Sequence, residues 1–168
     1  MDMGTVHIVF VRKGSRELYA VGGEDFLTPV TGLSVGFDLR ACFTEETACI
    51  AQCSRLFIPV GISVQPCSTD VAGFVYSRSG LGARDGLTVA QGVGVIDSDY
   101  TGEILVPLLN TSGKERVVQR GERIAQLVFQ PIVRPRWKEC ARLIPTDRGS
   151  GGFGHTGRQE ICFIADKL

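Results

Sequence analysis

Residues 87–109 read Leu-Thr-Val-Ala-Gln-Gly-Val-Gly-Val-Ile-Asp-Ser-Asp-Tyr-Thr-Gly-Glu-Ile-Leu-Val-Pro-Leu-Leu. Two segments rich in β-branched and aliphatic residues, 87–96 and 104–109, flank a polar segment with the composition of a turn. Neither segment has the spacing of apolar positions that an amphipathic helix requires. The stretch therefore predicts two short β-strands joined by a turn.

The same kind of segment recurs along the chain, separated by Gly, Pro and polar residues. Further strands are predicted at residues 6–11, 33–41, 56–64, 71–76, 117–118 and 124–133. The last two are expected to form a hairpin around a turn at 119–122. The one helical candidate is residues 80–85, with Ser77 or Ser79 as its N-cap. This pattern predicts an all-β fold, a jelly-roll-like barrel or sandwich.

The chain length predicts one domain with a C-terminal arm. Of the 168 residues, 43% are hydrophobic, which is enough for a core. We assign residues 1–146 to the domain and 147–168 to the arm. Residues 147–157 hold five glycines and bury little apolar surface, so the arm is expected to be mobile when no ligand is bound. Residues 158–168 extend past this segment and are apolar at 161–164.

Composition excludes several classes of protein. Lys+Arg and Asp+Glu both total 18, which argues against nucleic-acid binding through bulk charge. No apolar run approaches the length of a membrane span, and residues 1–10 lack a secretory signal, so a cytoplasmic protein is expected. The six cysteines are then expected to be reduced thiols. Cys49 and Cys53 lack a second pair of ligands for zinc.

Residues 91–102 form the first candidate site. Gly92 and Gly94 weaken a strand but let a ligand approach its backbone closely, where amide groups can read a base edge. Asp97 lies at the end of that strand, where a carboxylate can orient and deprotonate a water molecule. The alternative is that Asp97 and Asp99 only make a turn.

Three further clusters suit phosphate or base recognition. Arg78 and Ser79 follow a strand and open a short helix, although they also fit an ordinary helix cap next to a surface arginine. Gln126 lies on an apolar strand, as either a phosphate ligand or an outward-facing glutamine. Arg148 can bind phosphate with its fork of donors and Phe153 can stack on a base, although their segment also fits a disordered tail.

Together with Gly36-Phe-Asp-Leu-Arg-Ala41, these clusters resemble, in chain order, the five motifs of the homotrimeric dUTPase family. The resemblance runs from about residue 36 to residue 157. It implies a β jelly roll assembled as a threefold trimer. Each active site would take its first, second and fourth motifs from one subunit, the third from a neighbour and the fifth from the remaining subunit's arm.

The resemblance implies hydrolysis of dUTP to dUMP and pyrophosphate, with Mg²⁺ on the triphosphate. Such an enzyme limits uracil incorporation into DNA and supplies dUMP for thymidylate synthesis. Asp97 would activate the water that attacks the α-phosphorus, and Asp38 would help to hold the hydrated Mg²⁺. Tyr100 would pack under the deoxyribose and leave no room for a 2′-hydroxyl.

The remaining substrate contacts follow from the same resemblance. The uracil would be read by the strand containing Gln91, Gly92, Gly94, Val95 and Ile96. The phosphates would be bound by Arg78, Ser79 and Gly80 with help from Gln126. From the arm, Phe153 would stack on the uracil, and Arg148, Gly154, His155 and Thr156 would close over the nucleotide. The sequence departs from the common family pattern at Phe37, Ser77, Gln91 and Thr101.

Two rival functions are considered. A dCTP deaminase shares the fold but resembles this chain less, because its relatives carry a glutamate in place of the water-activating aspartate. A catalytically idle nucleotide sensor or protein-binding regulator would not need every catalytic residue of the family. Pyrophosphate release from dUTP, compared with UTP, dCTP and dTTP, distinguishes all three.

Overall fold

The computed structural model describes residues 4–20, 27 and 32–152. The chain divides into two units at residues 133 and 134, which is earlier than the predicted start of the arm at 147. The described elements all lie in the first unit. They are β1 (Val6–Phe10), α1 (Ser15–Tyr19), β2 (Phe37–Arg40), β3 (Thr47–Ile50), β4 (Arg55–Pro59), β5 (Ile62–Pro66), β6 (Val71–Ser77), η1 (Leu81–Asp85), β7 (Leu87–Val89), β8 (Gly94–Ile96), β9 (Leu105–Asn110), β10 (Arg116–Gln119) and β11 (Arg123–Pro131).

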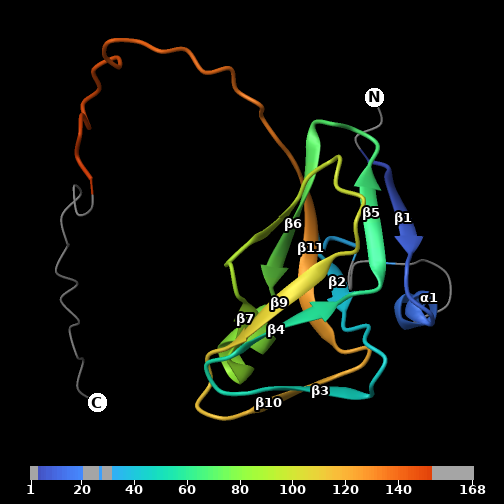
Figure 1. Cartoon of the computed structure of the whole chain (residues 1–168). Helices are drawn as coiled ribbons and strands as arrows, with labels where there is room; N and C mark the ends of the chain where they lie inside the picture. The colour runs from blue at the N-terminus through green and yellow to red at the C-terminus, as the bar shows by residue number, and fades with distance from the viewer. Residues whose placement is uncertain (1–3, 21–26, 28–31, 153–168) are drawn as a thin grey trace, which may run out of the picture. The chain divides into compact units, whose positions relative to one another are not determined.

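The strands form four sheets, and every pairing among them is antiparallel. The largest sheet has the order β2-β11-β6-β8, and a three-stranded sheet has the order β4-β9-β7. Two further pairs are β1-β5 and β10-β3 (Figure 1). The all-β prediction is confirmed, and no sheet closes on itself within the described residues.

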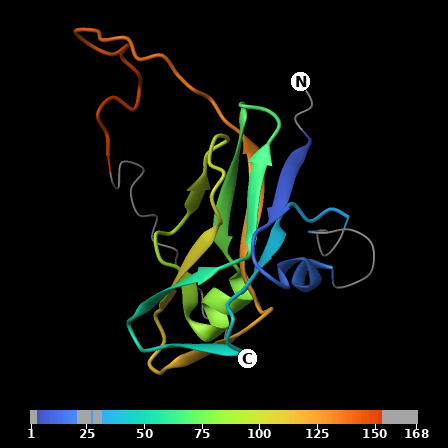
Figure 2. The same ribbon diagram turned by 45° about the vertical axis from the view of Figure 1, so that its right-hand side comes forward.

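One hydrophobic core joins these sheets. The buried side chains come from strands of all four sheets, and Figure 2 shows these strands from a second direction. They include Leu39, Ile58, Val106, Leu108, Ile124 and Leu127, each at most 1% exposed. Burying such a side chain contributes about 1.5–3 kcal/mol, so packing between the sheets holds the short strands in place.

Two predicted strands are each divided in two. The segment 56–64 breaks between β4 and β5, because Gly61 has a φ of 74° and a Cβ there would lie 2.6 Å from the Cβ of Ser15. The chain then passes from the sheet of β4 to that of β5. The segment 87–96 breaks between β7 and β8, where Gly92 has a φ of 82°. The predicted 33–41 strand begins only at Phe37.

The predicted hairpin and the predicted helix cap are wrong. Strand β10 pairs with β3, whereas β11 pairs with β2 and β6, so the turn at 119–122 joins two different sheets. The helical segment is a single π-helical turn, Leu81–Asp85, whose N-cap Gly80 makes no side-chain cap bond. Ser77 instead accepts a hydrogen bond from the backbone N–H of Val89 at 2.8 Å. Neither α1 nor β3 was predicted.

Asn110 is the main buried polar residue that joins strands. Its side-chain amide donates to the carbonyls of Ile50 and Lys114, both at 2.8 Å, and to that of Ala51 at 3.3 Å. Its side-chain oxygen accepts from the backbone N–H and the hydroxyl of Ser112. The residue is 0% exposed. These bonds tie the end of β9 to the end of β3 and to the β9–β10 loop.

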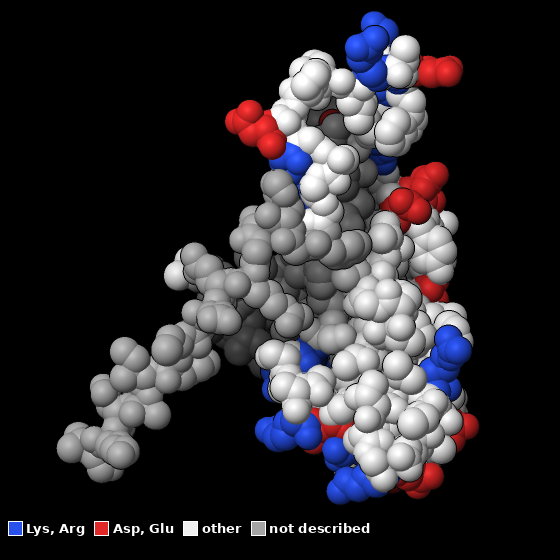
Figure 3. All heavy atoms as spheres, turned by 90° about the vertical axis from the view of Figure 1, so that its left-hand side faces the viewer, with Lys and Arg blue, Asp and Glu red and all other residues white. Residues whose placement is uncertain are grey.

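Acidic and basic side chains are interspersed on the surface. On the face shown in Figure 3, blue and red side chains lie near one another, with broad uncharged areas between them. This distribution matches the zero formal net charge. Where residues are described, the chain has no helix with the length and apolar character to cross a membrane.

Candidate active site

Strand β8 is the short outer strand of the four-stranded sheet. It pairs only with β6, with Gly94 opposite Val75 and Ile96 opposite Gly73. A Cβ on Gly94 would lie 3.1 Å from Nε2 of Gln91 and 3.2 Å from Cβ of Val75. Glycine therefore lets the Gln91 amide and the strand backbone approach one another. The outer side of β8 has no strand partner among the described residues, so its peptide groups can face a ligand.

Asp97 follows β8 directly and begins a turn. Its carbonyl accepts a hydrogen bond from the Tyr100 N–H at 3.1 Å. The Tyr100 hydroxyl donates to the Glu103 carbonyl at 2.9 Å, and a Cβ on Gly102 would lie only 2.5 Å from that hydroxyl oxygen. The position of Asp97 in this turn fits the alternative interpretation that the residue makes a turn. The same turn also holds the exposed Asp97 carboxylate near the Tyr100 ring.

A pocket of about 230 Å³ lies along this loop. It is lined by Val75, Gln91, Gly94, Val95, Ile96, Asp97, Tyr100, Ile104 and Leu105. The structure therefore brings together most of the residues that were predicted to contact the base, the sugar and the water. The lining combines apolar walls, exposed backbone and a single carboxylate, the mixture expected of a small-molecule site.

A second cluster joins β2, β11 and the end of β6. Asp38, Gln126 and Tyr76 lie side by side in the strand register. Arg78 donates from Nε to Oδ1 of Asp38 at 2.9 Å and from Nη1 to the carbonyl of Arg123 at 3.0 Å. Arg123 donates from Nη1 to Oδ2 of Asp38 at 3.1 Å. The predicted phosphate ligands Arg78 and Gln126 thus share one cluster with the predicted metal contact, Asp38.

Arg123 is the residue of this cluster that sequence reasoning missed. It starts β11, three positions before Gln126, and a β-bulge between Arg123 and Ala125 shifts the register there. The available signal was its place in residues 121–127, the segment around Gln126 that resembles the fourth family motif. Two arginines on one carboxylate leave a net positive cluster, which attracts anions.

Ser79 and Gly80 lie at the start of the turn after Arg78, and both are exposed. The turn is held by a hydrogen bond from the Gly82 N–H to the Arg78 carbonyl at 2.9 Å. Gln126 is half-buried, and its side-chain oxygen would lie 3.2 Å from a Cβ on Gly36. Gln126 therefore packs against the first motif rather than simply facing solvent.

The two clusters lie at opposite ends of β6. Continued by one residue past the pair of Ile96 and Gly73, the register places Asp97 beside Ala72 near the start of that strand, whereas Arg78 follows its end. Because a strand rises about 3.3 Å per residue, the two residues are on the order of 20 Å apart within one chain. One chain does not bring the predicted base and the predicted phosphate ligand together.

In the second unit, the described residues end at Gly152. Arg148 donates from Nε to the Gly151 carbonyl at 3.1 Å, and Gly149, with a φ of 51°, closes a turn to Thr146. The predicted ligands Phe153, Gly154, His155 and Thr156 lie outside the described residues. Their roles stay predictions.

Within the described part of the chain, no group of three or more His, Cys, Asp or Glu residues could hold a metal ion. Asp38 is the carboxylate of the cluster with Arg78 and Gln126, and both of its oxygens already accept hydrogen bonds from arginines. Mg²⁺ keeps several waters and binds through one or two carboxylates plus substrate phosphates. These donors fit an outer, water-mediated contact to Mg²⁺ and not a site built by protein ligands alone.

Comparison with known proteins identifies the family. The model of the dUTPase family matches residues 24–157. The deoxyuridine 5'-triphosphate nucleotidohydrolase of Actinobacillus pleuropneumoniae serotype 5b is 43% identical over 139 residues, which cover 82% of this chain and 91% of the relative. The protein of the same name from Escherichia coli is 37% identical over the same shares of the two chains. The chain belongs to the dUTPase family, as the motif resemblance predicted.

Solved structures share the fold. A mutant of the Staphylococcus bacteriophage 80alpha dUTPase with dUpNHpp has a TM-score of 0.77 and 20% identity, and the similarity covers 92% of this chain and 99% of that chain. The dUTPase of Streptococcus mutans has a TM-score of 0.64 and 22% identity, covering 79% and 98%. These similarities confirm the jelly-roll-like β fold.

Proposed function

We propose that this protein hydrolyses dUTP to dUMP and pyrophosphate, as a dUTP diphosphatase. The observation that carries the proposal is the loop after β8, where Asp97, Tyr100 and the open edge of the strand line one pocket. Membership of the dUTPase family supplies the substrate. In a cell, this activity limits uracil incorporation into DNA and provides dUMP for thymidylate synthesis. A cytoplasmic location fits that role.

The active enzyme is proposed to be a homotrimer with shared sites. The separation of Asp97 from Arg78 within one chain supports this arrangement. A second subunit could place its own Asp97 loop against the cluster of Asp38 and Arg78. Exposed apolar side chains on β4, β8 and β9 are available for such a contact, namely Phe57, Val95 and Leu105.

Asp97 acts as the general base in this proposal. It is exposed and directly follows an ordered strand, so it can reach a water molecule from a fixed point of the backbone. The water attacks the α-phosphorus and loses its proton to the carboxylate, while pyrophosphate leaves. A positioned base typically contributes about 10²–10⁴-fold to the rate.

The pocket recognises deoxyuridine through backbone and shape. Peptide groups from Gln91 to Ile96 on the free edge of β8 bond the uracil, which needs no charged side chain. Gly92 and Gly94 keep that edge accessible. The Tyr100 ring lies under the deoxyribose and leaves no space for a 2′-hydroxyl.

The other cluster binds the triphosphate. Asp38 fixes the Arg78 guanidinium in orientation, so that little side-chain entropy is lost when phosphate binds. Arg123 adds charge, and Ser79, Gly80 and Gln126 add polar contacts. Mg²⁺ would neutralise phosphate charge; it would be held mainly by the substrate, and Asp38 would contact its hydration water. A solved structure of the Staphylococcus aureus phage phi11 dUTPase is described as revealing the coordination of a structural Mg(II) ion.

The arm, residues 147–168, completes the site. Phe153 stacks on the uracil, and Arg148, Gly154, His155 and Thr156 cover the phosphates. Closure of such a segment excludes water from the reacting centre and occurs only when the ligand provides contacts.

Pyrophosphate release tests the proposal. Purified protein with Mg²⁺ is supplied separately with dUTP, UTP, dCTP and dTTP, and pyrophosphate and ammonia are measured together. We expect pyrophosphate from dUTP at a rate far above the other three. Ammonia from dCTP would identify a deaminase instead, and binding of dUTP without any turnover would identify a nucleotide sensor.

A further inference from the structure

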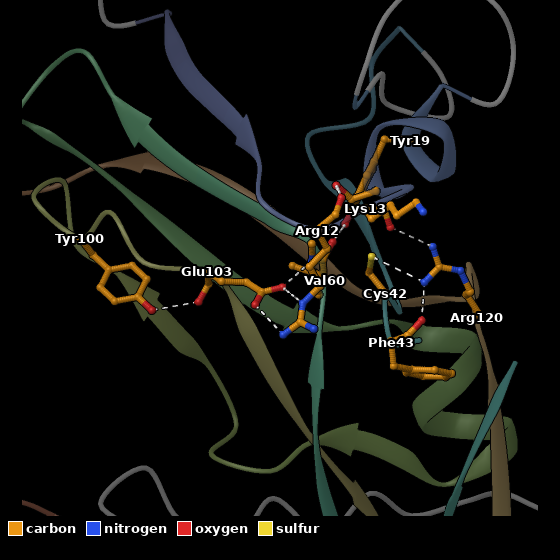
Figure 4. A network of polar contacts seen from close by, with 11 residues as sticks. Arg12, Lys13, Tyr19, Cys42, Phe43, Val60, Tyr100, Glu103 and Arg120 are labelled. Carbon is orange, nitrogen blue, oxygen red and sulfur yellow. Dashed lines mark hydrogen bonds and ion pairs between the residues drawn. The ribbon is translucent and has the colours of Figure 1, made fainter. Parts of the chain in front are cut away.

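Glu103, which ends the loop after β8, is joined to two distant parts of the chain. Its Oε1 accepts from Nε of Arg12 at 2.5 Å and from the Gly61 N–H at 2.9 Å (Figure 4). Its Oε2 accepts from Nη2 of Arg12 at 2.8 Å. Arg12 follows β1, and Gly61 lies between β4 and β5. The carboxylate therefore joins three segments at one point.

The same residue holds the Tyr100 ring. Its carbonyl accepts the Tyr100 hydroxyl at 2.9 Å, and that hydroxyl oxygen lies 2.5 Å from where a Cβ on Gly102 would be. The next residue is anchored too, because the Ile104 N–H donates to the Ile62 carbonyl at 3.0 Å. The position of the ring thus depends on a carbonyl whose own residue is fixed by its side chain.

The contact between Arg12 and Glu103 is a two-bond fork, and such forks fix orientation as well as adding energy. Their side chains are 41% and 19% exposed, so solvent screens part of the attraction. Its main effect is therefore geometric. Arg12 and Glu103 do not line the pocket beside Asp97.

We propose that Glu103 and Arg12 are positioning residues that hold the Tyr100 ring and thereby set the discrimination between deoxyribonucleoside and ribonucleoside triphosphates. The inference rests on the proposed function, in which Tyr100 lies under the sugar. The Tyr100 ring excludes a 2′-hydroxyl only if the ring stays in place. A shift of about 1 Å in a supporting residue is enough to loosen a site. Loss of the fork removes one of the anchors of the Glu103 carbonyl and lets the Tyr100 ring shift.

The test compares kcat/KM for dUTP and for UTP in Glu103→Gln and Arg12→Lys. The first keeps the shape of the side chain and the second keeps its charge, yet both lose the charged fork. We expect the ratio of dUTP to UTP to fall by about tenfold in each, the low end of discrimination by pocket shape. Glu115→Gln is the matched control, because it makes the same change on an exposed loop residue and should leave the ratio unchanged.

A double variant tests whether Glu103 affects the dUTP-to-UTP ratio by holding the Tyr100 ring. Tyr100→Phe removes the hydroxyl that reaches Glu103, so it should lower the ratio by itself. Adding Glu103→Gln should then lower it by less than about twofold more, since residues in one network are not additive.

Each other result has a distinct meaning. If the unaltered protein does not turn over dUTP, the proposed function is wrong. If it prefers dUTP but both single variants keep that preference, the positioning role is overturned and the function stands. A fall in melting temperature with equal losses for both nucleotides also overturns it, because that pattern marks a purely structural contact. Should Glu103→Gln fail to fold, Arg12→Lys decides alone.

Discussion

Asp97 and Arg78 lie near opposite ends of β6, because Asp97 falls beside Ala72 near the start of the strand and Arg78 follows its end. No movement within a folded strand can bring them together. If both act on one substrate, the proposed trimer lets each come from a different subunit.

Complementation between two inactive variants tests this relationship. Asp97→Asn and Arg78→Ala should each be inactive alone. Chains mixed in equal amounts during refolding should recover activity at about a quarter of the sites, the fraction expected for random assembly into symmetric oligomers. Each recovered site takes Arg78 from one variant and Asp97 from the other. Zero activity in mixed trimers, with trimer formation verified by light scattering, would show that one chain supplies both residues.

Asp97→Asn alone should abolish turnover while leaving substrate binding intact. The amide cannot accept the proton of the attacking water, and general-base catalysis is worth about 10²–10⁴-fold. Calorimetric titration with dUTP measures binding, and pyrophosphate release measures turnover. A loss of less than about tenfold, or 1.4 kcal/mol, would mean that Asp97 is not the base. Asp99→Asn, in the same turn, serves as the control.

Asn110→Ala should destabilise the fold strongly. It removes the donor to three carbonyls and the acceptor for Ser112, all at a residue that is 0% exposed. Unsatisfied buried groups cost about 1–3 kcal/mol each. We expect a clear fall in the free energy of unfolding measured with urea. Gln52→Ala, at an exposed position nearby, should change it by less than about 0.5 kcal/mol.

Cys42 should resist alkylation under native conditions. Burial raises the pKa of the Cys42 thiol, and Arg120 opposes that shift only in part. Iodoacetamide near pH 8 should therefore modify the exposed Cys49, Cys53 and Cys67 first, as peptide mass spectrometry would show. In urea, Cys42 should react as fast as the others.

The direction of the pH effect on stability follows from the same pKa. The folded protein holds the Cys42 proton to higher pH than the unfolded chain does. Stability from this group is therefore complete below the ordinary thiol pKa of about 8.5 and is lost as pH rises above it. Equal labelling of Cys42 and Cys49 in the native protein would contradict both expectations.

Phe153→Ala should impair catalysis without lowering the melting temperature. The predicted stacking of this ring on uracil is worth about 1–3 kcal/mol, so KM should rise or kcat should fall. Thermal unfolding followed by circular dichroism provides the second measurement. A large loss of thermal stability would place the ring in a core instead.

The sequence predicted the strand-rich fold because β-branched segments and turn residues carry that signal locally. It did not predict where those segments divide. Gly61 and Gly92 read as isolated glycines inside strands, and only their positive φ values show that each one ends a strand. Strand β3 was missed because its residues, Thr47–Ile50, follow a polar stretch and pair with a partner far along the chain.

Candidate site residues were found where a motif was nearly complete within one segment, as around Asp97. Contacts between segments were not foreseen. The bridge from Arg123 to Asp38 and the fork from Arg12 to Glu103 join residues far apart in the sequence. No local pattern marks such a pair, because the fold alone brings the two residues together.

Strand β11 has a consequence for synthesis of the protein on the ribosome. It lies between β2 and β6, yet it is the last strand of the first unit to be translated. Until residue 131 has left the exit tunnel, the four-stranded sheet lacks its middle, and both neighbouring strands present open edges. Such edges pair readily with other chains. A ribosome that stalls before residue 123 would therefore release a fragment prone to aggregation, whereas one that stalls after residue 131 would release a fragment that contains all four strands of the sheet.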